Sequence, residues 1–260
     1  MVLVMGVLNV TPDSFYDGGR WFDQEAAVRR GQEMIAEGAD VIDVGGESTR
    51  PGAAPVDDAE ERRRVLPVVA ALAPHIRVSI DTRKPGVAEA AVAAGATLIN
   101  DVSATLAPVA ATCGVGWVAM HMQGEPATMQ LSPRYTDVVG EVRQFLGDAG
   151  VRAAQAGVKE IWLDPGIGFG KTMAHNLQLL RHLDELVDLG WPVLVGTSRK
   201  SFLGRLAAGP GLPPAPVDQR LAGSLAAAVW CMVHGAAMVR VHDVAATVQA
   251  ARLVGHTVAA

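Results

Sequence analysis

Eight short apolar runs alternate with eight longer amphipathic segments along this chain, and that alternation limits what it can fold into. The apolar runs are typical of buried parallel strands, and the longer segments have the apolar spacing of helices that cover a sheet. We expect strands at 3–10, 41–45, 77–81, 97–101, 116–121, 161–164, 193–196 and 238–241, and helices at 23–37, 58–72, 85–94, 106–112, 137–156, 176–189, 218–233 and 244–253. Repeated strand–helix units predict an α/β fold with a single domain over 1–260, a (β/α)8 TIM barrel. An open doubly wound sheet with as many strands is the alternative.

Composition narrows the partners and the compartment of the protein. The formal net charge of −5 argues against a general nucleic-acid binder, so an anionic substrate must be bound by local Arg, Lys and backbone N–H groups. No run approaches about 18 uninterrupted apolar residues, which argues against a membrane span. The chain also starts with an apolar run that lacks the basic segment of a signal peptide. We therefore expect a cytoplasmic protein in which Cys113 and Cys231 are reduced and buried.

The stretch at 161–172, IWLDPGIGFGKT, looks at first like a nucleotide-binding loop. A phosphate-binding loop of the form GxxxxGK[ST] needs glycine five residues before Gly170, where the chain has Pro165. The dinucleotide pattern GxGxxG fails as well, because its last position is Lys171. What remains is a strand that ends in Asp164, followed by a loop in which Lys171 is a structural residue.

Polar residues also stand at the carboxyl ends of the other expected strands, which a barrel brings together at one mouth. In chain order they are Asn9; Glu47, Ser48, Thr49 and Arg50; Asp81; Asn100 and Asp101; His121; Asp164; Ser198, Arg199 and Lys200; and Arg240 and His242. Taken alone, each of them is compatible with a purely structural role, as a helix cap or an internal partner. A barrel that held only its own core would need none of them, so together they predict an active site.

These strand-end residues fall into two chemical sets. The carboxylates, amide and ammonium of Asp81, Asn100, Asp164 and Lys200 suit the donor and acceptor edge of a flat polar heterocycle. The amide, hydroxyl, guanidinium and imidazole groups of Asn9, Thr49, Arg50, Arg240 and His242 suit an anion such as diphosphate. Asn9 is also a candidate ligand for a Mg²⁺ ion that the phosphates carry, because this metal prefers oxygen ligands.

Several of these residues have a second interpretation. Arg240 and His242 can belong to an internal salt-bridge element with Asp81, and Asp101 faces the opposite side of its strand from Asn100, as a structural or helix-capping acid would. His121 is equally compatible with a site wall and with the core. No metal-ligand spacing typical of zinc and no nucleophile elbow is present, so a covalent intermediate is not indicated.

Eight motifs along the chain resemble those of the bacterial dihydropteroate synthases of folate biosynthesis. In order they are MGVLNVTPDSF, DVGGESTRPG, SIDT, IND, MHMQG, LDPGIGFGKT, GTSRKSFLG and RVHDV, and the resemblance runs from about Met5 to about Val254. It implies a (β/α)8 barrel, usually a homodimer, that uses Mg²⁺. The implied reaction condenses 6-hydroxymethyl-7,8-dihydropterin diphosphate with 4-aminobenzoate to give 7,8-dihydropteroate and diphosphate.

The resemblance also implies a role for each matching residue. It assigns the pterin to Asp81, Asn100, Asp164 and Lys200, with Met120 and Phe169 as pocket walls; diphosphate to Thr49, Arg50, Arg240 and His242, with Asn9 at the metal; and aminobenzoate to Phe15, Pro51 and Ser201. Among these, Lys200, Asp81, Arg240, His242 and Arg50 are the expected catalytic residues.

The implied mechanism is a dissociative substitution, in which diphosphate leaves before the amine attacks. Carboxylates on one side of the developing cation and cationic groups around the leaving group suit that order of events. The alternative is a non-catalytic pterin-binding barrel, or a barrel that presents a methyl-pterin to a methyltransferase partner. A methyl-transfer barrel has no diphosphate to bind, so the anion site of Arg240 and His242, together with Lys200, distinguishes it from the synthase.

Overall fold

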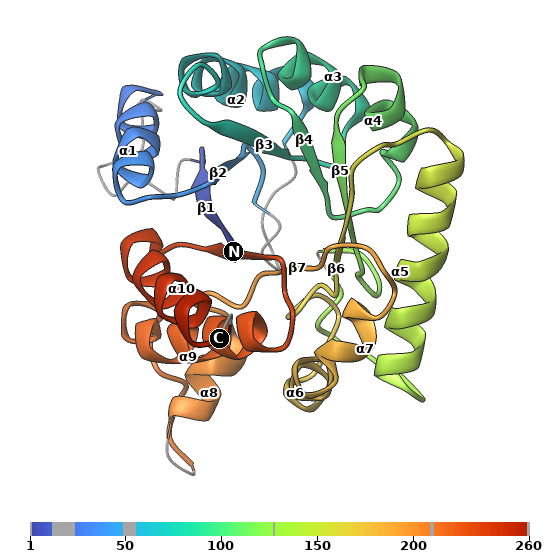
Figure 1. The fold of residues 1–260 in the computed structure, drawn as a ribbon, viewed down its shortest axis with the longest axis vertical. Helices are drawn as coiled ribbons and strands as arrows, with labels where there is room; N and C mark the ends of the chain where they lie inside the picture. Colours follow the sequence, from blue (N-terminus) through green and yellow to red (C-terminus); the bar gives the residue numbers. More distant parts are fainter. Residues whose placement is uncertain (1, 12–23, 49–55, 127, 209–210, 259–260) are drawn as a thin grey trace.

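The computed structural model describes residues 2–11, 24–48, 56–126, 128–208 and 211–258 (Figure 1). Its parallel strands stand at the centre and its helices surround them, as Figure 1 shows. The strands are β1 (Leu3–Asn9), β2 (Val41–Gly45), β3 (Arg77–Asp81), β4 (Leu98–Asp101), β5 (Gly116–Met120), β6 (Ile161–Asp164), β7 (Leu194–Val195) and β8 (Met238–Val241).

The eight strands form one sheet in the order β6-β5-β4-β3-β2-β1-β8-β7, and neighbouring strands in it run parallel. The two ends of that order meet, because Leu163 of β6 makes a parallel bridge with Val193, next to β7. Its N–H also donates to the carbonyl oxygen of Pro192 at 3.0 Å. The strands therefore close into a nearly complete barrel, which confirms the predicted (β/α)8 fold and shows that the open-sheet alternative is wrong.

The helices of the described part of the chain lie on the outside of the barrel. They are α1 (Gln24–Ala36), α2 (Asp58–Leu72), α3 (Pro85–Ala93), α4 (Ala107–Cys113), α5 (Val138–Gln155), α6 (Met173–Arg181), α7 (Leu183–Val187), α8 (Ser201–Ala207), α9 (Leu221–Val233) and α10 (Val244–Val258), with a short 3-10 helix at Val217–Gln219. Most boundaries lie within a few residues of those predicted. Among the described residues, no helix is both long and apolar enough to cross a membrane.

Three helix predictions were inaccurate. The helix expected at 176–189 starts earlier, at Met173, and is interrupted at His182, whose φ of −111° and ψ of 35° are not helical. The seven-residue α8 was not predicted, because it follows the loop after β7 at once and is too short to show a clear helical period. The last helix continues past the predicted end at 253 to Val258.

The strands separate two hydrophobic clusters. A small cluster inside the barrel contains Met5, Val41, Leu98, Val118, Trp162, Leu194 and Met238, and a larger one fills the space between the strands and the helices. Side chains alternate between the two faces of a strand. The residue two positions after each member of the inner cluster, on the same strand, therefore also faces the barrel interior. These include Asp43, Asn100, Asp164 and Arg240. Apolar residues therefore fill the barrel interior beneath a layer of charged and polar groups.

Asp101 faces the other way, toward the helices, and is a structural acid as predicted. Its Oδ1 accepts hydrogen bonds from the N–H and hydroxyl of Ser103, at 2.9 and 2.6 Å. Its Oδ2 accepts from the N–H groups of Thr105 and Leu106, at 2.7 and 2.6 Å, and from Nε1 of Trp117 at 3.1 Å. One fully buried carboxylate thus connects the end of β4, the start of α4 and the indole of β5.

We predict that Asp101→Asn destabilises the protein by about 3 kcal/mol, because an amide group replaces an acceptor-only carboxylate and leaves buried N–H donors unpaired. Urea unfolding followed by circular dichroism measures the change. The exposed substitution Asp148→Asn is the matched control and should leave the midpoint unchanged. A midpoint for Asp101→Asn equal to that of the control would contradict the structural role.

Candidate active site

The carboxyl ends of the strands surround a cavity of about 480 Å³. Seven of the predicted site residues line it, namely Asn9, Asp81, Phe169, Lys200, Ser201, Arg240 and His242. Asn100, Met120 and Asp164 are buried at the ends of neighbouring strands, with exposures of 4%, 4% and 5%. The remaining four, Phe15, Thr49, Arg50 and Pro51, lie outside the described residues. The structure thus brings residues of both predicted sets to one end of the barrel.

A charged network crosses the barrel interior at the floor of this cavity. Arg240 of β8 donates from Nε to Asp43 Oδ2 at 2.6 Å and from Nη2 to Asp81 Oδ2 at 2.7 Å. Asn100 of β4 donates from Nδ2 to the same Asp43 oxygen at 2.9 Å. Arg240 therefore pairs with Asp81, as the salt-bridge interpretation expected. Both predicted sets contribute to this one network.

Asp43 belongs to this network but was missed in the sequence. It lies in the middle of β2, within the apolar run VIDVG, whereas only residues at strand ends were considered. The alternation of strand side chains could have revealed it, because Asp43 is two residues before Gly45, which pairs with Asp81. Asp43 is fully buried, and a buried acid needs a partner. The signal in the sequence is a single acid within an apolar run.

Burial and mutual charge shift the ionisation of the network. Burial raises the pKa of Asp81 to about 7, with the attraction of Arg240 opposing the shift and the repulsion of Asp43 adding to it. Burial lowers the pKa of Arg240, but the charges of Asp43 and Asp81 outweigh it and raise that pKa above its ordinary value. The guanidinium is thus permanently charged, while burial makes the ionised form of Asp81 costly.

Lys200 and Asp164 affect each other's ionisation. Lys200 donates to the carbonyl oxygen of Ile167, and its Nζ lies 4.8 Å from the centre of the Phe169 ring. Asp164 accepts from the N–H of Gly166 at 2.7 Å. Burial raises the pKa of Asp164, with the attraction of Lys200 opposing it, and burial lowers the pKa of Lys200 to about 8.

The glycine-rich loop after β6 is held by Lys171, which is a structural lysine as predicted. Its Nζ donates to the carbonyl oxygens of Gly166 and Phe169 at 3.0 Å each and of His121 at 3.2 Å. Gly166 has a φ of +63°, and a side chain there would collide with the carbonyl of His121. The glycines thus serve close backbone packing. Their loop places Phe169 beside the cavity.

His121 belongs to the core, which decides between its two interpretations. It is 7% exposed, its Nδ1 lies 2.9 Å from Lys171 Nζ, and its ring packs edge-on against Phe145. Burial and the charge of Lys171 lower its pKa to about 3, so the imidazole is neutral.

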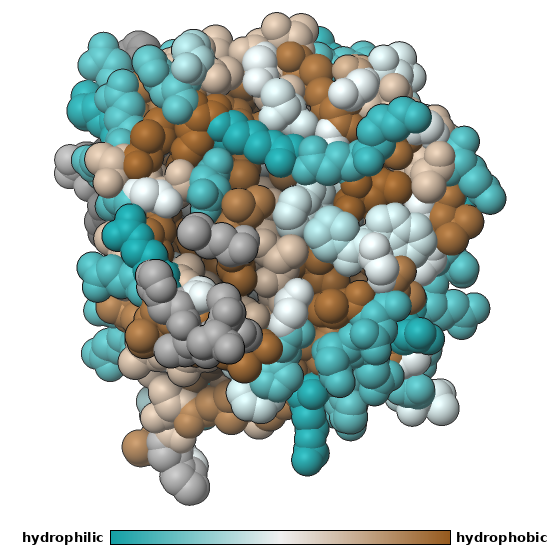
Figure 2. All heavy atoms as spheres, in the orientation of Figure 1, coloured by the Kyte–Doolittle hydropathy of each residue, from teal (hydrophilic) through white to brown (hydrophobic). Residues whose placement is uncertain are grey.

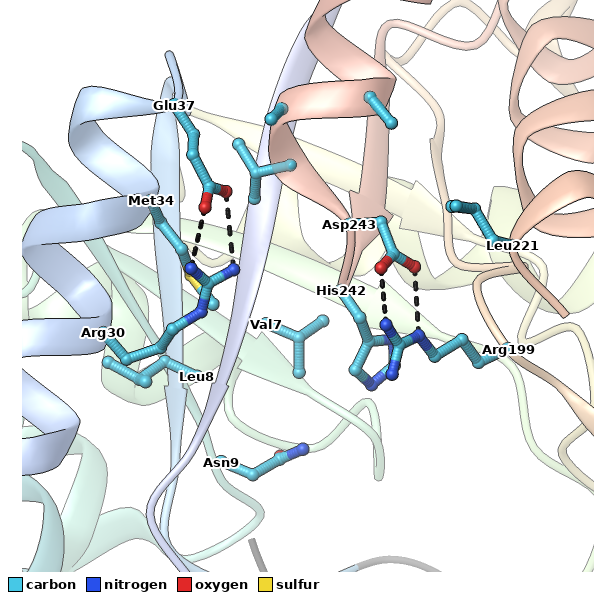
Figure 3. A pocket seen from close by; sticks show the side chains of 13 residues that line it. Val7, Leu8, Asn9, Arg30, Met34, Glu37, Arg199, Leu221, His242 and Asp243 are labelled. Atoms are coloured by element: carbon cyan, nitrogen blue, oxygen red, sulfur yellow. Dashed lines mark hydrogen bonds and ion pairs between the residues drawn. The ribbon is translucent and has the colours of Figure 1, made fainter. Parts of the chain in front are cut away.

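The loops after β7 and β8 are joined to each other beside the cavity. Ser198 Oγ lies 3.0 Å from His242 Nδ1 and accepts from the His242 N–H at 3.1 Å. Arg199 makes a two-pronged ion pair with Asp243 and has a φ of +57°, rare for a residue with a side chain. Figure 3 shows this pair in a neighbouring cavity of about 660 Å³, with Asn9 and His242 also in its wall and the Arg30–Glu37 pair on the α1 side.

The chain resembles known proteins along nearly its whole length. The sequence pattern of the family described as "Pterin binding enzyme" matches residues 5–242. The chain belongs to that family. It is 47% identical to the dihydropteroate synthase of Escherichia coli over 99% of this chain and 92% of the relative, and 48% identical to that of Mycobacterium leprae over 98% and 93%.

Solved structures of pterin-binding enzymes share the whole fold. The dihydropteroate synthase of Yersinia pestis in complex with a sulfonamide drug superposes with a TM-score of 0.92 at 46% identity, covering 100% of this chain and 95% of that one. The enzyme of Xanthomonas albilineans with 4-aminobenzoic acid gives a TM-score of 0.90 at 47% identity, covering 100% and 94%.

We predict that Lys200 titrates with a midpoint near pH 8, well below its ordinary value of 10.5. The side chain is then an ammonium below pH 8 and a neutral amine above it, because burial penalises the charged form. Proton–carbon NMR of protein labelled at the lysine ε-carbons measures the titration, and the signal missing from Lys200→Met identifies the residue. A midpoint above pH 10 would contradict the buried environment described for Lys200.

Proposed function

We propose that the chain is a dihydropteroate synthase. It joins 6-hydroxymethyl-7,8-dihydropterin diphosphate to 4-aminobenzoate and releases diphosphate. The observation that carries the proposal is the floor of acceptors, Asp81, Asn100 and Asp164, together with the cationic side chains of Lys200 and Arg240 that line the same cavity. The near-complete length over which the chain matches known dihydropteroate synthases supports it.

The arrangement of charge supports a dissociative substitution. Carboxylates at Asp81 and Asp164 stabilise positive charge that develops on the pterin methylene. Cationic groups stabilise the diphosphate as it leaves, and we assign this part to Arg240 and His242, together with Thr49 and Arg50. The aromatic amine of the second substrate is neutral near pH 7, so its attack needs no separate general base.

The remaining assignments concern the two ring systems. We assign the faces of the pterin to Met120, at the end of β5, and to Phe169, in the loop after β6. Lys200, with its pKa near 8, donates to the acceptor edge of the pterin. Ser201, at the start of α8, contacts aminobenzoate together with Phe15 and Pro51.

We also propose that Mg²⁺ enters with the diphosphate. Mg²⁺ retains several waters and usually binds through one or two protein oxygens together with substrate phosphates. Within the described ranges, no cluster of three His, Cys, Asp or Glu residues is placed to bind a metal alone. The amide oxygen of Asn9 at the rim fits a metal that the substrate brings, and the ion would neutralise charge on the leaving group.

A methyl-pterin barrel remains the second candidate, and the same cavity separates the two functions. Such a barrel shares the pterin floor but has no leaving diphosphate to bind. The positions of Arg240, His242 and Lys200 around the cavity therefore favour the synthase.

We predict that the purified protein, mixed with Mg²⁺, the pterin diphosphate and 4-aminobenzoate, forms dihydropteroate. Lys200→Ala should weaken binding of the pterin, while Arg240→Ala should mainly weaken binding of diphosphate, each by at least tenfold, or about 1.4 kcal/mol. Chromatography of the product and calorimetry with each ligand measure these effects. Folded protein without turnover would contradict the synthase, and equal losses of both ligands in both variants would contradict the division of roles.

We further propose that the protein works as a homodimer in the cytoplasm. A groove of about 430 Å³ between α6, α8 and α9 is lined by Leu177, Leu180, Phe202, Leu203, Leu206, Ala226, Ala227 and Trp230, with flanking residues. Leu206 and Trp230 are 49% and 46% exposed, and Figure 2 shows apolar side chains where α8 lies, at the lower left. An apolar face of this kind suits a second copy of the chain. Cys113 and Cys231 are free thiols, which suits a reducing compartment. Cys231 is buried, but Cys113 is half-buried, so the expectation that both are buried was wrong for Cys113.

We predict that Leu206→Glu yields monomers, because the dimer would have to bury an unpaired carboxylate. Sedimentation velocity measures the mass in solution. The control is Leu131→Glu, at a position that is 82% exposed and lies after β5. A wild-type monomer, or a Leu206→Glu dimer as tight as the control, would contradict this interface.

A further inference from the structure

Asp43 bonds two groups of the proposed site but is itself fully buried in β2. Arg240 Nε and Asn100 Nδ2 both donate to its Oδ2, at 2.6 and 2.9 Å. Because both donors share one oxygen, the guanidinium lies directly beside the amide. A carboxylate beside a guanidinium only accepts hydrogen bonds, so the nitrogen end of the Asn100 amide must face Asp43.

The orientation of that amide determines what Asn100 offers to a ligand. Its Oδ1 is turned away from Asp43, is buried, and has no hydrogen-bond partner among the described residues. An unpaired buried acceptor is costly and uncommon, so this atom requires a donor that a ligand can bring. The Asp81 and Asp164 carboxylates also accept hydrogen bonds, so the floor presents three acceptor groups.

The acceptor at Asn100 suits the donor that distinguishes one oxidation state of the pterin ring. A 2-amino-4-oxo pterin has donors at N3 and at its amino group, and the 7,8-dihydro form adds a donor at N8. Oxidation removes that hydrogen and leaves an acceptor at N8. We propose that Asp43 is a positioning residue that holds Asn100 as an acceptor, and that the site thereby prefers the reduced ring to the oxidised ring.

Arg240 bonds both Asp43 and Asp81, so a ring that approaches Asp81 competes with one of these contacts. Its Nη2 holds Asp81, whose side chain is 15% exposed, while its Nε holds Asp43, which is 0% exposed. The outer contact can open while the inner contact keeps the guanidinium next to the floor. The ring donors then replace Arg240 as the partners of Asp81.

The test compares affinities for two rings that carry no diphosphate, 6-hydroxymethyl-7,8-dihydropterin and 6-hydroxymethylpterin, by anaerobic calorimetry. This inference rests on the proposed function. In the wild type the reduced ring should bind about tenfold more tightly, as expected for one hydrogen bond in a buried site. Asp43→Asn should reduce that ratio to near one, because an amide at 43 can donate to Asn100 and let its oxygen turn inward.

Two further variants show whether Asp43 acts through Asn100. Ser79→Ala is the matched control, because Ser79 pairs with Asp43 in register, is fully buried, and has a hydroxyl without a partner in the described part of the chain. It should keep the wild-type ratio. Asn100→Ala should lose the preference, and adding Asp43→Asn to it should change the ratio no further. An equal loss of affinity for both rings in Asp43→Asn would show a merely structural role and overturn the proposal.

The unmodified protein provides a second measurement if Asp43→Asn does not fold. One side-chain amide proton of Asn100 should exchange slowly with solvent in NMR spectra, with and without the reduced ring, because it is bonded to Asp43. Rapid exchange of both protons would overturn the proposal. Wild-type protein that binds neither ring and makes no dihydropteroate would instead contradict the proposed function. Normal turnover with an unchanged ratio in Asp43→Asn would contradict only the role of Asp43.

Discussion

Closure of the barrel places every second strand residue in its interior. Below, Met5, Leu98, Trp162 and their neighbours fill that space with apolar side chains. One layer higher the same faces carry Asp43, Asn100 and Arg240, in contact with each other. Charges at this depth must pair, because an isolated buried ion is very costly. The pairing of these residues therefore defines both the floor of the cavity and the directions in which its polar atoms point.

The loop after β6 extends this rigid floor to the side wall. Lys171 donates to the carbonyl oxygens of three residues. The positive φ angles of Gly166, Gly168 and Gly170 allow the loop to turn tightly against the segment that follows β5. Phe169 is consequently placed next to the Lys200 ammonium. A lysine and a glycine-rich loop that resemble a phosphate site are thus used here for packing, while the groups that suit an anion stand on β1 and β8.

The sequence predicted well what depends on one strand at a time. The end of each apolar run is visible, so Asp81, Asn100, Asp164 and Lys200 were found, and the repeated units indicated the barrel. What it could not predict depends on register between strands. Asp43 and Arg240 are 197 residues apart in the chain. They meet because β2 and β8 both flank β1 in the sheet, and both side chains face the barrel interior. The break at His182 and the short α8 were also missed, since tertiary packing decides such local features.

The balance of charge in the interior suits the proposed chemistry. Asp43, Asp81 and Asp164 provide three carboxylates, and Arg240, Lys200 and the buried Lys171, which also attracts Asp164, provide three basic groups. Burial raises the pKa of Asp81 to about 7, with the attraction of Arg240 opposing the shift, so the ionised form of this carboxylate is costly in the empty site. A substrate whose ring becomes positive as diphosphate leaves would favour that ionised form, so the burial that penalises the carboxylate in the empty site strengthens its attraction to the cation.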